Sequence, residues 1–199
     1  MPSPRKSNRQ SQQESPDGRD LLILELQEIH SGESQLSRVL PRLSQSADSA
    51  SLREQLDARL EEGERILKDV DAALEELDAS PGRKKNVAAE GLINDAREHV
   101  QEIATGPGLD AVLIGAVQKT EHYCIAAWGT ARALAEALGE KNAARSMERA
   151  IKEGKSFDEE LTELAEKEIT PALLSQGSGE GEDAGGRRSQ KNGGERRAT

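Results

Sequence analysis

The sequence predicts an all-α protein: a four-helix bundle with an additional crossover helix. Aromatic residues, which favour strands, make up 2% of the 199 residues and are limited to Tyr123, Trp128 and Phe157. Leu, Ala, Glu, Arg and Lys dominate instead, as they do in helical bundles. Aliphatic residues also recur at alternating steps of four and three, which marks the buried stripe of a helix. The core is therefore expected to consist of Leu, Ile, Val and Ala.

Five helical segments are predicted in the middle of the chain. In the first segment, Asp20 is a candidate N-terminal cap and Pro41 predicts a kink. Four segments are long enough to form two antiparallel hairpins, and the shorter third segment is expected to cross between them. The predicted segments cover residues 20–47, 50–78, 84–104, 109–138 and 141–169.

Helix-breaking residues set the predicted ends of the last four segments. The second segment ends before Ser80-Pro81-Gly82, and the third ends at Gly106-Pro107-Gly108. The fourth ends at Gly139 and the fifth before Pro171, because glycine terminates helices and proline cannot continue their hydrogen-bond ladder. These signals predict one bundle domain over residues 20–172.

The two ends of the chain have a different composition. Residues 1–19 lack apolar periodicity, and residues 173–199 are rich in glycine and carry mixed charges. Neither segment can bury enough apolar surface to offset the conformational entropy of ordering it. We therefore expect disordered tails over 1–19 and 173–199.

Charge and composition exclude several classes of protein. The formal net charge is −10, and residues 21–174 carry 18 basic and 30 acidic side chains. Such an acidic body argues against nucleic-acid binding, which requires cations to neutralise phosphates. The sequence contains no apolar run of about 18 residues, which is the length that would predict a membrane span. The N-terminus also lacks the apolar region of a secretory signal. The single cysteine, Cys124, fits a reducing compartment, so a cytoplasmic protein is expected.

Each long segment has a break near the middle of its aliphatic stripe. The breaks fall at Glu33, Arg59, Cys124 and Gly154. A carboxylate buried alone is normally neutralised, paired or bound to a metal; alternatively, local winding of the helix lets Glu33 reach solvent. The coincidence of four breaks predicts a polar layer at the centre of the bundle.

Di-metal carboxylate sites occupy this position in many helical bundles. Their usual ligands are one Glu from each of two helices and a Glu-x-x-His pair from each of the other two. The sequence contains no Glu-x-x-His, and only the reversed spacing occurs, as His30-x-x-Glu33 and His99-x-x-Glu102. Such spacings arise easily in Glu-rich helices, so they are weak indications of a metal site.

Several stretches resemble the YciE/YciF-type ferritin-like proteins, which are related to rubrerythrin. They are residues 22–36 with Leu40-Pro41, residues 90–93, the Glu-His-Tyr and Gly-Thr-Ala-Arg block of residues 121–135, and residues 161–166. The resemblance covers residues 20–170. It implies a ferritin-like fold, a homodimer and an association with stress responses in bacteria.

The same resemblance implies metal-binding groups at six positions of this chain. Glu33, Glu62 and Glu121 match the family pattern, whereas Arg59 stands in place of a histidine. Cys124 and Gly154 stand in place of glutamates. A guanidinium stays protonated and cannot bind a metal, but its charge relieves the repulsion among nearby carboxylates.

We therefore expect a degenerate di-metal site in which Arg59 neutralises Glu33 or Glu62. The residual bundle-centre site comprises Glu33, Arg59, Glu62, Glu121 and Cys124. This predicts a dimeric structural or interaction protein that is not an enzyme and has no cofactor.

Two alternatives keep a metal at this centre. Glu33, Glu62 and Glu121 could hold iron, manganese or zinc, and a Cys124 thiolate would favour zinc. Such a protein would be a metal-binding protein or an oxidoreductase that reduces peroxide or oxygen. The departures at Arg59, Cys124 and Gly154 argue against the enzyme.

Overall fold

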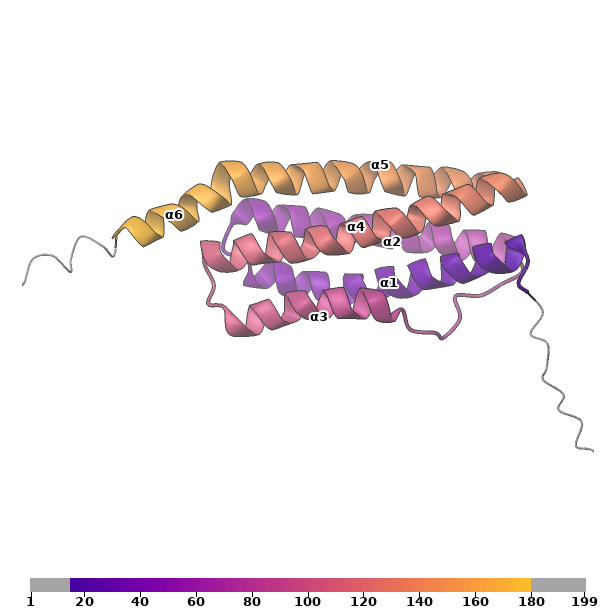
Figure 1. The fold of residues 1–199 in the computed structure, drawn as a ribbon, viewed down its shortest axis with the longest axis horizontal. Helices are drawn as coiled ribbons and strands as arrows, with labels where there is room; N and C mark the ends of the chain where they lie inside the picture. Colours follow the sequence, from indigo (N-terminus) through magenta and orange to yellow (C-terminus); the bar gives the residue numbers. More distant parts are fainter. Residues whose placement is uncertain (1–14, 180–199) are drawn as a thin grey trace, which may run out of the picture.

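The computed structural model describes residues 15–179, and all regular structure in this part of the chain is helical (Figure 1). The all-α prediction is therefore confirmed. No helix of the described part is long and apolar enough to cross a membrane. The elements are α1 (Gly18–Ser46), α2 (Ala50–Glu76), α3 (Val87–Glu102), α4 (Pro107–Leu138), α5 (Lys141–Leu164), the π-helical turn η1 (Ala165–Ile169) and α6 (Thr170–Gly179).

Two helical hairpins form the bundle, as predicted. The most extensive contacts join α1 to α2 and α4 to α5, which are the partners within each hairpin. The hairpins pack together through α1 against α4 and through α2 against α5. Helix α3 lies along α1 and α4 on the outside of the bundle, which makes it the crossover helix (Figure 1).

The apolar core consists of two clusters, one on each side of the bundle centre. The first contains Leu40, Leu56 and Leu113, and the second contains Leu26 and Val70, all of which are buried. On α1, α2 and α5 the boundary between the clusters falls at the predicted breaks. On α4 it falls between Val117 and Cys124, and Cys124 itself belongs to the second cluster. A polar layer therefore divides the core, because its side chains take the positions that would otherwise join the clusters.

The cap of α1 differs from the prediction. Asp17, not Asp20, is the N-cap residue: its carboxylate accepts the N–H of Asp20 at 2.9 Å. The carboxylate of Asp20 in turn accepts the N–H of Asp17 at 3.2 Å, which completes a capping box. Helix α1 continues through Pro41 to Ser46, and the kink at Pro41 stays a prediction.

The prediction that the last helix ends before Pro171 is wrong. The N–H of Thr170 bonds to the carbonyl of Ala165, so one π-helical turn precedes α6. The wider turn shifts the pattern of backbone hydrogen bonds along the helix. Pro171 therefore lies in the first turn of α6, where a missing N–H is tolerated.

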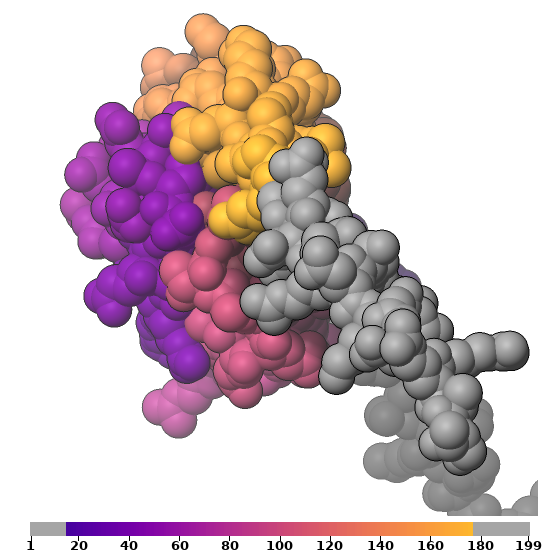
Figure 2. Space-filling view, turned by 90° about the vertical axis from the view of Figure 1, so that its left-hand side faces the viewer, coloured from indigo at the N-terminus to yellow at the C-terminus, as the bar shows by residue number. Residues whose placement is uncertain are grey.

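Residues 173–179, which the sequence assigns to a disordered tail, thus belong to α6. Helix α6, yellow in Figure 2, lies at the end of the bundle and contacts α4. Gly18 and Arg19, which the sequence assigns to the N-terminal tail, belong to α1 because the helix is capped at Asp17. Residues 1–14 and 180–199 of the predicted tails lie outside the described residues.

Candidate functional site: an arginine at the bundle centre

The guanidinium of Arg59 occupies the centre of the polar layer, and its side chain has no exposed surface. Its Nη2 donates to both carboxylate oxygens of Glu33, each at 3.1 Å. Its Nε donates to Oε2 of Glu121 at 2.7 Å. One arginine thereby joins three helices, since Arg59 lies on α2, Glu33 on α1 and Glu121 on α4.

The electrostatics keep this arginine charged. Burial alone lowers the pKa of Arg59, but the attraction of Glu33 and Glu121 outweighs it and raises the pKa well above its ordinary value. Breaking a buried ion pair leaves an uncompensated charge, which typically costs about 3–5 kcal/mol of stability. The three side chains therefore act as one structural unit.

The partner of Arg59 differs in part from the prediction. The sequence predicts that Arg59 neutralises Glu33 or Glu62, whereas its hydrogen bonds go to Glu33 and Glu121. Glu62 is buried nearby on α2, and its Oε1 has no hydrogen-bond partner among residues 15–179. Burial raises the pKa of Glu62 to about 7 despite the opposing attraction of Arg59. Glu62 therefore holds a proton to a higher pH than an ordinary glutamate does.

Two further residues complete the surroundings of Arg59. The ring centroid of the fully buried Trp128 lies 5.7 Å from its Cζ, which is a cation–π contact. A Cβ on Gly154 would lie 2.5 Å from Oε1 of Glu121 and 2.7 Å from Cζ3 of Trp128. The backbone of α5 therefore meets the centre at Gly154, and Glu121 and the Trp128 ring take up the space that a side chain there would need.

Cys124 is buried beside the layer as a neutral thiol. Its exposed fraction is 6%, and burial, followed by the repulsion of Glu33 and Glu121, raises its pKa well above the ordinary value. Zinc binds cysteine as a thiolate. The environment of Cys124 therefore does not favour the zinc alternative.

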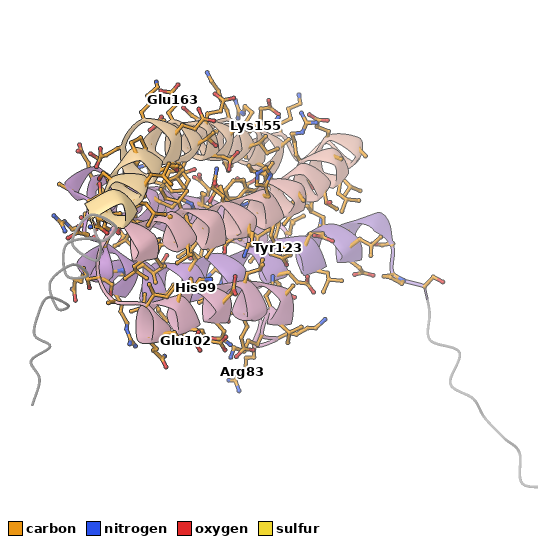
Figure 3. The ribbon with its side chains drawn as sticks, turned by 60° about the vertical axis from the view of Figure 1, so that its left-hand side comes forward. Arg83, His99, Glu102, Tyr123, Lys155 and Glu163 are labelled. Carbon is orange, nitrogen blue, oxygen red and sulfur yellow. The ribbon has the colours of Figure 1, made fainter. Side chains whose placement is uncertain are left out.

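The histidines of the reversed motifs lie away from the centre. Nε2 of His30 is 3.3 Å from Oδ1 of Asp71, and Nε2 of His99 is 3.7 Å from Oδ1 of Asp95. His99 and Glu102 belong to the outer helix α3 (Figure 3). Neither histidine belongs to the Arg59 cluster, and of the residues in these two spacings only Glu33 does.

The residues at the centre do not fit a di-metal site. Arg59 already bonds both oxygens of Glu33 and one oxygen of Glu121, so its positive charge stands where a metal ion would have to bind. Within residues 15–179, no three or more His, Cys, Asp or Glu side chains are arranged to hold a metal ion. We accordingly derive no metal-dependent chemistry for this centre.

A further buried carboxylate, Asp110, lies in the first turn of α4 and was not predicted from the sequence. Its side chain accepts the backbone N–H of Asp48 at 2.9 Å and that of Ser49 at 2.8 Å. Asp110 thereby fastens the turn between α1 and α2 to the start of α4. An acidic residue two positions after Gly106-Pro107-Gly108 was the available signal, because helix N-termini favour negative charge.

The two hairpins, the crossover helix and the buried acidic layer define the class: a ferritin-like four-helix bundle in which an arginine occupies the centre. The particular family follows from the sequence. A family model described as "Domain of unknown function (DUF892)" matches residues 17–174, and the chain belongs to this family.

Known relatives confirm the resemblance to YciF. Protein YciF of Escherichia coli (strain K12) is 38% identical over 147 residues, which is 73% of this chain and 89% of YciF. The crystal structure of the E. coli stress protein YciF matches with a TM-score of 0.74 and 36% identity, covering 78% of this chain and 99% of that chain. YcfI from Rhodopseudomonas palustris matches with a TM-score of 0.71 and 31% identity, over 76% of this chain and 96% of YcfI.

Proposed function

We propose that this protein is a non-catalytic, stress-associated bundle in which Arg59 replaces the cations of a di-metal centre. The observation that carries the proposal is the pair of contacts from one buried guanidinium to Glu33 and Glu121. The association with stress rests on the similarity to the E. coli stress protein YciF. In this proposal the centre stabilises the fold, and the outer surface of the bundle contacts partners.

Physical chemistry supports this proposal over an oxidoreductase. A catalytic metal needs several ligands and an open coordination position. At this centre an arginine, a glycine and a tryptophan occupy the space, and a divalent cation beside Arg59 would be repelled by its charge.

The proposal includes a homodimer in the bacterial cytoplasm. The exposed leucines Leu21 and Leu24 on α1 and Leu138 on α4 are candidates for the contact between two copies, because large apolar side chains gain from burial. Light scattering of the purified protein tests the dimer, with a mass of two chains expected. A monomer at micromolar concentration would contradict it.

Metal analysis tests the loss of the di-metal centre. The protein is loaded anaerobically with Fe²⁺, and separately with Mn²⁺ and Zn²⁺, and bound metal per chain is measured after desalting. We expect far less than one ion per chain. Two ions per chain, lost in Glu33→Ala, together with metal-dependent consumption of peroxide, would establish the oxidoreductase instead.

A matched pair of variants sharpens this test. Arg59→His puts a possible ligand beside Glu33 and Glu121, so we expect it to gain metal. Arg65→His makes the same exchange on the same helix, at a side chain that is 53% exposed and pairs with Glu153. Equal metal contents in the two variants would contradict the idea that Arg59 occupies the place of a cation.

A further inference from the structure

A groove with a positive lining runs along the outside of the bundle, between α1, the loop before α3, and α3 itself. Its larger part has a volume of about 350 Å³ and its smaller part about 120 Å³. Gln35, Arg38 and Lys85 line both parts, so the two are continuous. Arg83 marks the groove in Figure 3, on the side of the molecule opposite Lys155 of α5.

The charge of the groove is opposite to that of the molecule around it. Its arginines and lysines are Arg38, Arg83, Lys84, Lys85 and Arg97, and Glu90 is its one carboxylate. Residues 21–174 as a whole carry 30 acidic and 18 basic side chains. A basic groove on an acidic surface focuses the electrostatic field and attracts anions.

Neighbouring carboxylates leave most of this positive charge uncompensated. Lys85 pairs with Glu90, and Nζ of Lys84 lies 3.5 Å from Oε1 of Glu28. Arg97 bonds only the neutral side-chain oxygen of Asn94, at 3.3 Å. Within residues 15–179, the side chains of Arg38 and Arg83 have neither an ion pair nor a hydrogen bond.

The loop before α3, which carries Arg83, Lys84 and Lys85, is fastened to the bundle. Nε2 of Gln27 donates to the carbonyl of Ser80 at 2.7 Å. The buried Asn86 donates its backbone N–H to Oγ of Ser31 at 2.9 Å and its side-chain amide to the hydroxyl of Tyr123 at 2.7 Å. The groove is therefore held in shape by α1 and α4, which lowers the entropy that binding would cost.

We propose that this groove binds a small ligand that carries two or more phosphate groups. The planar fork of arginine matches phosphate oxygens in pairs, and the volume suits a small molecule. Arg83 lines only the larger part and Arg97 only the smaller part, with Arg38 between them. A ligand must span both parts to meet all three arginines, which requires more than one anionic group.

The confined size of the basic surface favours a small ligand over a nucleic acid. A long phosphate backbone would extend from the groove over the acidic remainder of the surface, where it would be repelled. Both a nucleotide and an inorganic polyphosphate carry the linked phosphate groups that the groove is proposed to bind.

Isothermal titration calorimetry of the full chain tests the proposal, with pyrophosphate and ATP as probes at physiological salt. In Arg38→Ala/Arg83→Ala we expect the Kd of both probes to rise by about tenfold or more, since charge-assisted hydrogen bonds are lost. The matched control, Lys152→Ala/Lys155→Ala, removes two exposed cations of α5 and should change the Kd by less than about twofold. Because ATP carries one phosphate more than pyrophosphate, tripolyphosphate is titrated beside it: tighter binding of ATP than of tripolyphosphate would identify a nucleotide, and equal binding a polyphosphate.

Three results would overturn the proposal. They are the absence of saturable binding of both probes, equal weakening in the groove and control variants, and tighter binding of duplex DNA or RNA than of either probe. Circular dichroism melting checks that all variants fold, as their exposed positions predict. None of these outcomes depends on the metal content of the bundle centre.

Discussion

Gly154 and Glu121 are so close that a Cβ on the glycine would lie 2.5 Å from the carboxylate oxygen Oε1. Helices α4 and α5 can therefore meet at the bundle centre only because residue 154 lacks a side chain. Glu121, which packs against Gly154 through this close approach, also accepts the hydrogen bond from Arg59. The small residue and the buried ion pair thus depend on one another.

The Gly154→Ala variant is expected to lose stability. Its methyl group would collide with Glu121 and the Trp128 ring, and overpacking of a core typically costs about 1–3 kcal/mol. Urea denaturation measures the change in the free energy of unfolding. The matched control is Gly91→Ala on α3, where a Cβ meets nothing within 4 Å, and which should gain about 0.5–1 kcal/mol from helix propensity. Similar effects in both variants would refute the close contact.

Removal of the central cation is expected to destabilise the fold strongly. Arg59→Leu leaves Glu33 and Glu121 buried without a partner, which should cost about 3–5 kcal/mol. Arg65→Leu removes an exposed arginine from the same helix and should cost less than about 1 kcal/mol. Chemical denaturation of the two variants at neutral pH checks the difference. If Arg59→Leu lost less free energy of unfolding than Arg65→Leu, Arg59 would not stabilise the bundle.

The protonation of Glu62 gives stability a pH dependence. Its pKa rises from an ordinary 4.5 to about 7 on folding because of burial, so the folded state binds the proton more tightly between these values. Its contribution to the free energy of unfolding is therefore present at low pH, falls as pH rises through this window and is lost above about pH 7.

The Glu62→Gln variant isolates this contribution. Relative to the wild type, it should gain about 1–2 kcal/mol above neutral pH, after allowance for solvent screening, and little at acidic pH. Denaturation curves across the pH range measure the difference. Glu61→Gln, at an exposed neighbouring position, should show no such trend. If the difference in the free energy of unfolding between Glu62→Gln and the wild type did not change with pH, the raised pKa of Glu62 would be contradicted.

The thiol of Cys124 is expected to be unreactive in the folded protein. Since burial raises its pKa and excludes reagents, labelling should be at least about 100-fold slower than in urea. The rate with a thiol-reactive chromophore is the measurement. A control chain with Cys124→Ala and Ala126→Cys moves the thiol to an exposed position and should react at once. Equal rates would show that the thiol is accessible.

The buried carboxylate of Asp110 is expected to hold the first hairpin against α4. Asp110→Ala removes the acceptor of the N–H groups of Asp48 and Ser49, and each hydrogen bond to a charged group contributes about 1.5–3 kcal/mol. Thermal melting should show a clear loss of stability. The matched variant Asp57→Ala, at an exposed position of α2, should change the melting temperature little.

Much of the fold could be predicted from local patterns. The positions of Leu26, Leu56 and Leu113 follow from helical periodicity, and the breaks at Glu33 and Arg59 are visible because charged side chains interrupt an otherwise aliphatic stripe. The end of the last helix could not be predicted, because the π-helical turn that accommodates Pro171 has no comparable local pattern.

The sequence by itself determined that the aliphatic stripes of four helices are interrupted at one level, three of them by polar groups, since the spacing of side chains along a helix is a local property. Only the tertiary structure decided which of these groups meet. The pairing of Arg59 with Glu121 rather than Glu62, and the use of Gly154 to admit Trp128, depend on the rotation and separation of neighbouring helices. Those quantities arise from side-chain packing between segments far apart in the chain, which a linear pattern does not record.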